Sequence, residues 1–577
     1  MKKVLFIVPI VVIMLITSIV AFTGCKADFS DGDNLVSFAS ATKGQTMKGF
    51  GASSAWWSQI VGNSANKEEV AKLLYGDEGM ALNIYRYNIG GGSKDLVNKI
   101  DGASYSTCWD NKQALSDANY YWELDRLTES FLMAENYSGS THDDLLAFVS
   151  NSANYDFTRD SGAQAMLAAS YALGNIDEVV LFVNSPHYLM TKNGMCRSSD
   201  GADNVDNLAE ENYDVFAEYL MQILKHFTDL GYPVKYLSPI NEPNWDWSDW
   251  KQEGCHYEPK SMAKCLNTVY TKLVAFNAAN GTSVNIDGYE SGNWRWKGSS
   301  NNPSYNEGFL NALVETDAFK AMDYVSYHSY SNPYKRADRE DFMKKSADYN
   351  IKIGISEYCQ MLKGVQLDEF GNAQLLALVI SYDLSILKSN QWNWWIGVSN
   401  EQTYNYEDGL IYTNWWADCE DAYYKDYYSN QYKGEKDSIR VSPRYYTMKH
   451  YANFVDAGDV RLELSFKNKK SNLGTHKAQQ DSDLFYAFKV TSVDGNSVEK
   501  MPYSDKIYDA FVKPDGTVVV VYTNVVEDEM MWTIEDNFKS YEAYTSTKDG
   551  YFVKSEGKFN HTYSFKGNSI TTLVLHP

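Results

Sequence analysis

The chain has 577 residues, of which 44% are hydrophobic and 22% charged, so its composition excludes a disordered or fibrous protein. Its 52 basic and 75 acidic residues give a net charge of −23, and nucleic acid or an anionic membrane would repel such a surface. Tyrosine (44 residues) and tryptophan (15 residues) are abundant. Their rings offer a flat apolar face and a polar edge that suit sugars, although a large aromatic core would explain the same composition.

The first 25 residues are typical of an export signal. A short positive segment at residues 1–3 precedes an almost wholly apolar run at residues 4–22. The small residue before Cys25 resembles a bacterial lipobox, with Phe22 where Leu is usual. We expect residues 1–24 to be a signal peptide of lipoprotein type and Cys25 to carry the lipid. An uncleaved membrane anchor is the alternative, because a run of this length just suffices to span a bilayer. Both readings place the rest of the chain outside the cell, as a surface lipoprotein or a secreted protein.

The sequence contains no recognisable metal or cofactor motif. The six cysteines after Cys25 form no CxxC pair, and their pairing in an exported protein stays open. The nine histidines include no HExxH motif, and the chain has no Walker loop, no GxGxxG before a helix and no GxSxG elbow. We therefore expect a protein that works without a metal or cofactor.

Between residues 45 and 455 the chain repeats a short β-rich apolar run followed by a helical pattern. Such runs predict eight strands, at residues 48–57, 83–89, 179–185, 234–241, 284–289, 324–328, 352–356 and 391–395. Helical patterns lie between them, for example at residues 66–75, 161–173, 213–230, 259–279, 373–387 and 443–453. Eight β/α units over about 400 residues predict a (β/α)8 TIM barrel, an α/β fold whose functional residues lie at the C-terminal strand ends.

After residue 456 the helical patterns give way to short strands with turn signals. Lys513-Pro514-Asp515-Gly516 before TVVVVYTN predicts a hairpin. We expect residues 456–577 to form a β-sandwich beside the barrel, joined by residues 29–44. Two insertions, at residues 93–160 and 400–440, leave C-terminal strand ends of the barrel, where they either wall a cleft or decorate the surface.

Two glutamates stand at the ends of predicted barrel strands. Glu242 follows the fourth strand in SPINEP, and Glu357 ends the seventh in IGISEY. A single glutamate is usually a solvated surface residue, but two at the C-terminal ends of different strands meet at the functional end of a barrel. Cleavage of a glycosidic bond requires two facing carboxyl groups: one protonates the leaving oxygen, and the other attacks the sugar or activates water. The pair therefore predicts a glycosidase.

Longer segments resemble glycoside hydrolase family 30, a family of retaining (β/α)8 enzymes with a side β-sandwich. The resemblance runs in chain order over about residues 40–577. The segments that carry it are GFGASSAWW (49–57), YRYNIGGG (85–92), NSPHYLMTKNG (184–194), SPINEPNW (238–245), SYHSY (326–330), ISEYC (355–359), QWNWW (391–395) and SPRYYTMKHYANFVDAG (442–458).

The resemblance implies roles for individual residues. Glu242 matches the acid/base, Glu357 the nucleophile and Asn241 the amide that binds the sugar 2-OH. The other substrate-binding residues that it implies are Arg86 near the nucleophile, His328 and Tyr330 on the sixth strand, and the aromatic residues Trp57, Tyr188 and Trp392, which are expected to stack on the sugar chain. Arg86 would keep Glu357 ionised. For Arg86 and His328, an ordinary polar contact inside the barrel is the alternative.

The same resemblance narrows the substrate. The segments around residues 49–57, 85–92 and 184–194 look most like the endo-β-1,6-galactanase branch, which implies internal cleavage of β-1,6-galactan in arabinogalactan side chains. A β-1,6-glucanase, a xylanase or a glucosylceramidase-like enzyme is the alternative, although Ser93 stands where glucosylceramidases have an aspartate. A non-catalytic carbohydrate-binding protein would be expected to lack one of the glutamates, and an aldolase would need a Schiff-base lysine at a strand end.

Few partners are expected beyond the substrate. We expect a monomer that binds a β-linked polysaccharide or oligosaccharide, and a neutral polymer suits its acidic surface better than a uronate-rich one. We expect no nucleic acid partner, and contact with a membrane only through the N-terminal lipid.

Overall fold

The computed structural model describes residues 34–96, 126–197, 206–247, 252–296, 306–330, 333, 336–360, 369–400, 408–414, 438–467, 489–491, 498–500, 507–525 and 527–577. The signal segment with Cys25 lies outside these ranges, as do most of the 400–440 insertion and part of the 93–160 insertion. Among the described helices, none is both long enough and apolar enough to cross a membrane.

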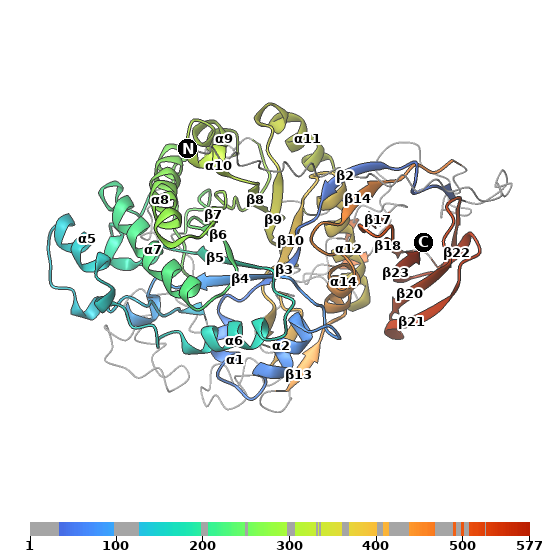
Figure 1. Cartoon of the computed structure of the whole chain (residues 1–577), viewed down its shortest axis with the longest axis horizontal. Coiled ribbons are helices and arrows are strands. Elements are labelled where there is room, and N and C mark those ends of the chain that lie inside the picture. The colour runs from blue at the N-terminus through green and yellow to red at the C-terminus, as the bar shows by residue number, and fades with distance from the viewer. Residues whose placement is uncertain are drawn as a thin grey trace, which may run out of the picture.

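Eight parallel strands form the barrel that the sequence predicts (Figure 1). They are β3 (Gly49–Ser53), β4 (Ile84–Ile89), β5 (Glu178–Val183), β6 (Val234–Ser238), β7 (Asn285–Ile286), β8 (Val325–His328), β9 (Ile353–Glu357) and β10 (Gln391–Trp394). They pair in the order β7-β6-β5-β4-β3-β10-β9-β8. An isolated parallel bridge between Ser291 and Tyr327 brings the β7 and β8 edges together, so the sheet curls into a barrel.

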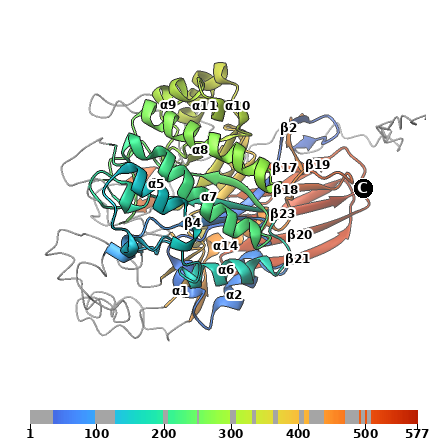
Figure 2. The ribbon, with the colours of Figure 1, turned by 60° about the vertical axis from the view of Figure 1, so that its left-hand side comes forward.

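The helices that follow the strands cover the outside of the barrel, as α7 and α8 show in Figure 2. The α-helices of the described residues are α1 (Trp57–Val61), α2 (Lys67–Tyr75), α5 (His142–Ser150), α6 (Ser161–Tyr171), α7 (Tyr213–Asp229), α8 (Pro259–Asn280), α9 (Asn306–Leu313), α10 (Asp317–Ala321), α11 (Arg336–Ser346), α12 (Glu369–Ser385) and α14 (Pro443–Ala452). Helix α8 shows how sequence sets such bounds. It starts at Pro259, which lacks the backbone N–H that a first turn leaves unused, and stops at Gly281, whose left-handed conformation (φ +66°) suits glycine.

Strand alternation divides the side chains of each strand between the barrel interior and the helical layer. On β4, Tyr85 and Tyr87 point outward and pack on Tyr75 of α2 and Phe227 of α7. Ile84 points inward, where it forms an apolar cluster with Val180, Tyr236 and Tyr324. Arg86, two residues further along the strand, points inward too and lies nearer the C-terminal end of the barrel.

A second region of the molecule consists mainly of antiparallel strands that follow the barrel, joined by β1 and β2 from before it, and β1 pairs with β19 in parallel (Figure 1). One sheet has the order β2-β14-β17-β18-β23-β20-β21 and another the order β1-β19-β22. Their strands are β1 (Leu35–Val36), β2 (Thr42–Thr46), β14 (Val460–Glu463), β17 (Ile507–Val512), β18 (Val518–Asn524), β19 (Met530–Ile534), β20 (Ser540–Thr547), β21 (Gly550–Lys558), β22 (Thr562–Phe565) and β23 (Ser569–His576). The predicted turn at Lys513–Gly516 connects β17 to β18, with Lys513 N–H donating to the Thr517 carbonyl.

Shorter strands complete the described elements. They are β11 (Val398–Asn400), β12 (Ile411–Thr413) and β13 (Ile439–Val441), which form one small sheet, and β15 (Lys489–Thr491) and β16 (Val498–Lys500), which pair with each other.

Helix α14 joins the barrel to the second region. Its His450 lies within 2.9 Å of hydroxyls on both Thr572 of β23 and Ser546 of β20. Burial lowers the pKa of His450 to about 3, so this imidazole is neutral. On the same helix, Tyr451 donates to Asp509 of β17, and Tyr445 donates to the Leu73 carbonyl of α2. The architecture confirms the predicted fold class, a (β/α)8 barrel with an attached β-sheet domain.

Candidate active site

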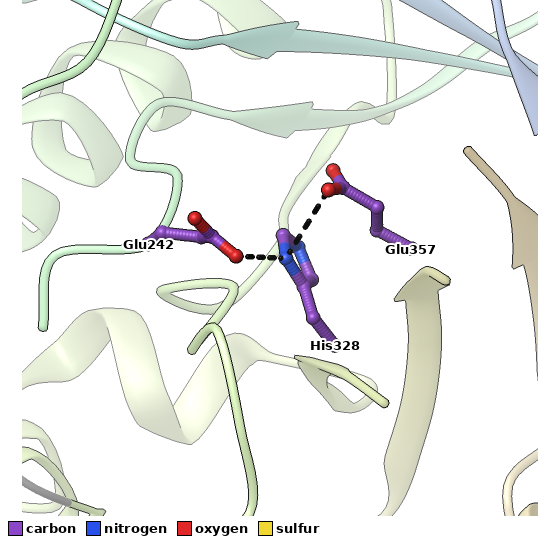
Figure 3. Close-up of side chains that lie close together, drawn as sticks. All are labelled: Glu242, His328 and Glu357. Carbon is purple, nitrogen blue, oxygen red and sulfur yellow. Dashed lines mark hydrogen bonds and ion pairs between the residues drawn. The ribbon is translucent and has the colours of Figure 1, made fainter. Parts of the chain in front are cut away.

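The C-terminal strand ends bring two glutamates and a histidine together (Figure 3). Glu357 is the last residue of β9 and His328 the last of β8, while Glu242 lies four residues beyond the end of β6. His328 stands between the two carboxylates: its Nδ1 is 2.9 Å from Oε1 of Glu242 and 3.6 Å from Oε1 of Glu357. An oxygen of Glu242 and an oxygen of Glu357 lie within 4.8 Å of each other.

Glu357 is surrounded by groups that stabilise its ionised form. Arg86 Nη1 lies 3.2 Å from Oε2, and the Tyr330 hydroxyl donates to Oε1 at 2.6 Å. Burial raises the pKa of Glu357 above its usual value, and the charges of His328 and Arg86 act against that rise. The sequence-based pairing of Arg86 with Glu357 is therefore present in the structure.

Arg86 contacts several groups from the centre of the site. Its Nη2 donates to the Asn241 side-chain oxygen at 3.3 Å and to Glu290 Oε2 at 2.5 Å. Its guanidinium lies 3.5 Å from the centroid of the Phe182 ring and 5.7 Å from that of Trp395. A buried guanidinium fixed by two carboxylates and an aromatic face holds one orientation, so Arg86 orders the residues around it.

His328 is held from both ring nitrogens by carboxylates. Its Nε2 lies 3.2 Å from Glu290 Oε2, opposite the Nδ1 contact with Glu242. Burial lowers the pKa of His328, but the surrounding carboxylates Glu357, Glu242 and Glu290 outweigh burial and raise it to about 10. His328 is therefore an imidazolium at neutral pH, with both nitrogens donating.

Glu242, His328 and Glu357 together also have the spacing of a metal-ligand set. A histidine ligates a metal through an unprotonated ring nitrogen. Because both nitrogens of His328 carry protons between carboxylates, this triad is better suited to proton transfer than to holding a cation.

The loop after β6 gives Glu242 an unusual backbone. Its φ is +44°, in the left-handed region that residues with a side chain rarely adopt. Its N–H donates to the Glu290 carbonyl at 2.9 Å, and its own carbonyl accepts from Trp245 N–H and from the Trp247 indole, both at 3.1 Å. Gly292 leaves room for the side chain, since a Cβ there would lie 2.8 Å from Glu242 Oε1.

Two expected stacking residues lie elsewhere. Strand β3 ends at Ser53 rather than at residue 57, so Trp57 begins helix α1, and its indole donates to the Ser53 carbonyl at 2.9 Å. Trp392 points into the helical layer, where its indole donates to Asp383 of α12 at 2.9 Å. Both side chains are completely buried, so the expectation that they stack on a sugar is wrong for this structure.

Tyr188 is also largely buried. It belongs to a small apolar cluster with Leu96, Leu127 and Cys196, and its ring stacks on His187 with centroids 4.4 Å apart. The described structure therefore gives Tyr188 a packing role, and a contact with the sugar stays a prediction.

Sequence reasoning missed Glu290 and Trp395. Glu290 directly follows the predicted fifth strand, so the rule that singled out Glu242 and Glu357 would have found it too. Trp395 lies beside Arg86, and its ring contacts Trp56 edge-on with centroids 4.9 Å apart. Side chains alternate between the two faces along a strand. Trp392 points outward and Trp395 lies three residues further on, so alternation along β10 predicts that Trp395 points inward.

Comparisons with known proteins point to one family of enzymes. Residues 142–412 match the model of O-glycosyl hydrolase family 30. An endo-β-1,6-galactanase of Hypocrea rufa is 28% identical over 243 residues, covering 40% of this chain and 44% of the relative. An exo-β-1,6-galactobiohydrolase of Bifidobacterium longum subsp. longum is 28% identical over 191 residues, covering 30% of this chain and 11% of the relative. The chain thus spans less than half the length of either relative.

Solved structures share the fold. A conserved exported protein from Bacteroides fragilis superposes with a TM-score of 0.70 at 21% identity, covering 94% of this chain and 99% of that one. The catalytic domain of a family 30 xylanase C from Talaromyces cellulolyticus gives a TM-score of 0.59 at 15% identity, with coverages of 94% and 99%. An endo-β-1,6-glucanase gives 0.57 at 14% identity, with coverages of 94% and 93%. The family match and the curated relatives confirm the resemblance to glycoside hydrolase family 30.

Proposed function

We propose that this chain is a glycoside hydrolase, a retaining endo-β-1,6-galactanase in which Glu242 is the acid/base and Glu357 the nucleophile. The observation that carries the mechanism is the approach of two carboxylate oxygens within 4.8 Å. Retaining pairs stand about 5–5.5 Å apart because the nucleophile reaches the sugar directly, whereas inverting pairs leave about 6.5–9.5 Å for a water. The surroundings support the division of roles, since Glu357 is buried among Arg86, Tyr330 and His328 while Glu242 is more exposed.

The reaction proceeds in two displacements. Glu357 attacks the anomeric carbon while Glu242 gives its proton to the glycosidic oxygen, so the bond to the leaving sugar breaks as the bond to Glu357 forms. Glu242, now ionised, then removes a proton from water, whose oxygen replaces Glu357 at the same carbon. Two inversions give net retention. Arg86 and Tyr330 hold Glu357 in the direction of attack through contacts of 3.2 and 2.6 Å.

We propose that Asn241 binds the sugar 2-OH. Its side-chain oxygen accepts from Arg86 at 3.3 Å, so the amide nitrogen is the atom that remains for the sugar. Hydrogen bonds to the 2-OH strengthen as positive charge develops on the ring in the transition state. We therefore assign to Asn241 a contribution to turnover as well as to binding.

The choice of β-1,6-galactan rests on relatives. Both curated relatives described above are named for action on β-1,6-linked galactose, and they are more similar in sequence than the xylanase and glucanase structures. A β-1,6-glucanase is the second candidate, because an enzyme named for that linkage shares the fold over 94% of this chain.

Trp245 supports cleavage inside a chain. It lies three residues past Glu242, which donates its proton to the leaving sugar, and 44% of its side chain is exposed. No other tryptophan among the described residues is exposed to that extent. Its backbone is fixed on both sides: its N–H donates to the Glu242 carbonyl, and its carbonyl lies 2.9 Å from His256 Nδ1. A rigidly mounted aromatic face offsets the entropy that a flexible β-1,6-linked chain loses when it binds.

Product analysis on three polymers tests the proposal. The protein is incubated with β-1,6-galactan, β-1,6-glucan and xylan, with Glu357→Gln as the matched blank, and products are separated by size. We expect short galacto-oligosaccharides to appear early from galactan. Release of monosaccharide alone would contradict internal cleavage, and faster cleavage of the glucan would move the assignment to the second candidate. No product from any polymer would contradict both.

We propose further that the enzyme is exported and held at the cell surface by a lipid on Cys25. The proposal rests on the apolar run at residues 4–22 and the Gly24-Cys25 junction. Incorporation of labelled fatty acid into the wild type but not into Cys25→Ala is the expected result. Equal labelling of both proteins would rule out Cys25, and release of unlabelled wild type into the medium would indicate simple secretion.

A further inference from the structure

Glu290 is a buried carboxylate that contacts the catalytic machinery without being one of the two catalytic carboxylates. It lies after β7, and its side chain is completely inaccessible. Its Oε2 accepts from Arg86 Nη2 at 2.5 Å and lies 3.2 Å from His328 Nε2, and its Oε1 accepts from the Ser238 hydroxyl. Arg86 and His328, the two cations beside Glu357, are thus each bound to Glu290 as well.

The backbone of Glu290 is also tied to the site. Its φ is +42°, so it adopts the same uncommon left-handed conformation as Glu242. Its carbonyl accepts the Glu242 N–H at 2.9 Å. Backbone strain of this kind persists at functional sites because the surrounding contacts overdetermine it. Glu290 therefore holds Glu242 through its backbone. Through its side chain it holds Arg86 and His328, the partners of Glu357.

The charges of the cluster explain what a third carboxylate adds. The titratable and charged groups around Glu290 are Arg86 from β4, Glu242 beyond β6, Asp287 beyond β7, His328 from β8 and Glu357 from β9. With Glu242 and Glu357 alone, two cations would balance two carboxylates and favour ionisation of both. With Glu290 ionised, the two cations are shared with a third carboxylate, so they stabilise the ionised form of Glu357 less.

We propose that Glu290 is a positioning residue that orients Arg86 and His328 through its side chain and Glu242 through its backbone, and whose negative charge offsets part of the positive charge beside Glu357. The inference rests on the proposed roles of Glu242 and Glu357 and extends them. Glu290 does not touch substrate, because its carboxylate is enclosed by Arg86, His328 and Ser238. Burial raises the pKa of Glu290, but Arg86 and His328 outweigh burial and hold it well below its usual range.

Asp287 offers a matched control on the same segment of chain. It is equally buried, and it accepts from the Ser326 hydroxyl at 2.7 and 2.8 Å, but no described contact joins it to Arg86 or His328. Burial and the nearby charge of Glu290 raise the pKa of Asp287 to about 8, so it is largely neutral at pH 7. Asp287→Asn therefore removes a buried carboxyl with little change in charge.

The pH profile of kcat/KM tests the proposal. In Glu290→Gln the cations act on Glu357 undiminished, so Glu357 ionises at lower pH. We expect the acid limb of the profile to move down by about one pH unit, and kcat at the wild-type optimum to fall about tenfold or more with KM nearly unchanged, because Arg86 and His328 lose the contact that orients them. Glu290→Asp keeps the charge further from the cations and should give a smaller shift in the same direction. Asp287→Asn should leave the acid limb in place.

Three results would overturn the proposal. These are a loss of activity in Glu290→Gln with an unmoved acid limb, an acid limb of Glu290→Asp that coincides with that of the wild type, and an equal shift in Asp287→Asn. If Glu290→Gln does not fold, the comparison of Glu290→Asp with the wild type tests the proposal by itself. Failure of the proposed catalytic roles would be visible separately, as turnover that survives in Glu357→Gln on the same substrate.

Discussion

The two ends of the barrel interior carry charged clusters of different composition. At the N-terminal end, Lys48 forms one ion pair with Glu178 at 3.0 Å, and its ammonium lies 3.8 Å from the centroid of the Tyr236 ring and 4.6 Å from that of Tyr324. At the C-terminal end, Arg86 and His328 face three carboxylates. Lys48 is held by a single carboxylate and two aromatic rings, whereas each cation at the C-terminal end is shared by at least two carboxylates. Sharing of cations thus separates the end that stabilises the barrel from the end that we propose is reactive.

The backbone conformation also differs between the two ends. Lys48 and Glu178 stand at or next to the starts of regular strands, while Glu242 and Glu290 both have left-handed φ values. A left-handed conformation costs roughly 1–2 kcal/mol for a residue with a Cβ. The reactive end thus contains strain that the rest of the fold offsets, as is common at functional sites.

The nucleophile should show the largest difference between the two ends. Glu357→Gln removes the atom that forms the covalent intermediate, so we expect kcat on β-1,6-galactan to fall at least about 10⁴-fold. Glu178→Gln changes a buried glutamate of the opposite end and should keep kcat within about twofold. The initial rate at which new reducing ends form gives kcat for both variants. Similar losses of kcat in Glu357→Gln and Glu178→Gln would contradict the proposed difference between the two ends.

Glu242→Gln should separate the two steps of the reaction. Without a proton donor, we expect kcat/KM on galactan to fall about 10³-fold, since general acid–base catalysis contributes about 10²–10⁴-fold. An aryl β-galactoside with a good leaving group needs no donor and should still be attacked by Glu357, with azide accelerating turnover. Equal loss on both substrates without azide rescue would assign Glu242 another role.

A smaller effect is expected at the exposed edge of the site. Trp245→Ala should lower kcat/KM on the polymer about tenfold, because stacking on an aromatic ring is worth about 1 kcal/mol or more, and leave a small aryl galactoside unaffected. Tyr171→Ala, which removes an exposed aromatic ring on α6, is the matched control. A similar decrease on both substrates in Trp245→Ala would indicate disturbance of Glu242 rather than loss of a sugar platform.

The Lys48 end should respond in stability instead of activity. Lys48→Met removes the ion pair and both ring contacts, and we expect the free energy of unfolding to fall by about 1–2 kcal/mol. kcat should stay within twofold. Chemical denaturation and an activity assay on the same preparation check this, and a large loss of activity without loss of stability would contradict the division between the ends.

The sequence predicted the strands better than the side chains near them. The eight predicted runs coincide with the eight barrel strands because buried parallel strands are continuous apolar runs, and Glu242 and Glu357 follow from where two of those runs end. Trp57 was misplaced because β3 ends four residues earlier than the aromatic run suggested. Trp392 was preferred over Trp395 because a cluster of tryptophans does not by itself show which ring faces inward. Glu290 follows the fifth predicted strand, so the strand-end rule would have identified it as a candidate, but its contacts with Arg86, Ser238, Glu242 and His328 form only when the barrel closes.

The anomeric configuration of the first product tests the central claim most directly. Proton NMR of the reducing ends newly formed from β-1,6-galactan distinguishes the two anomers before mutarotation mixes them. If Glu357 forms a covalent intermediate that Glu242 then helps water to open, the β-anomer appears first and the α-anomer follows slowly. If the α-anomer appears first, the two glutamates do not act as a retaining pair.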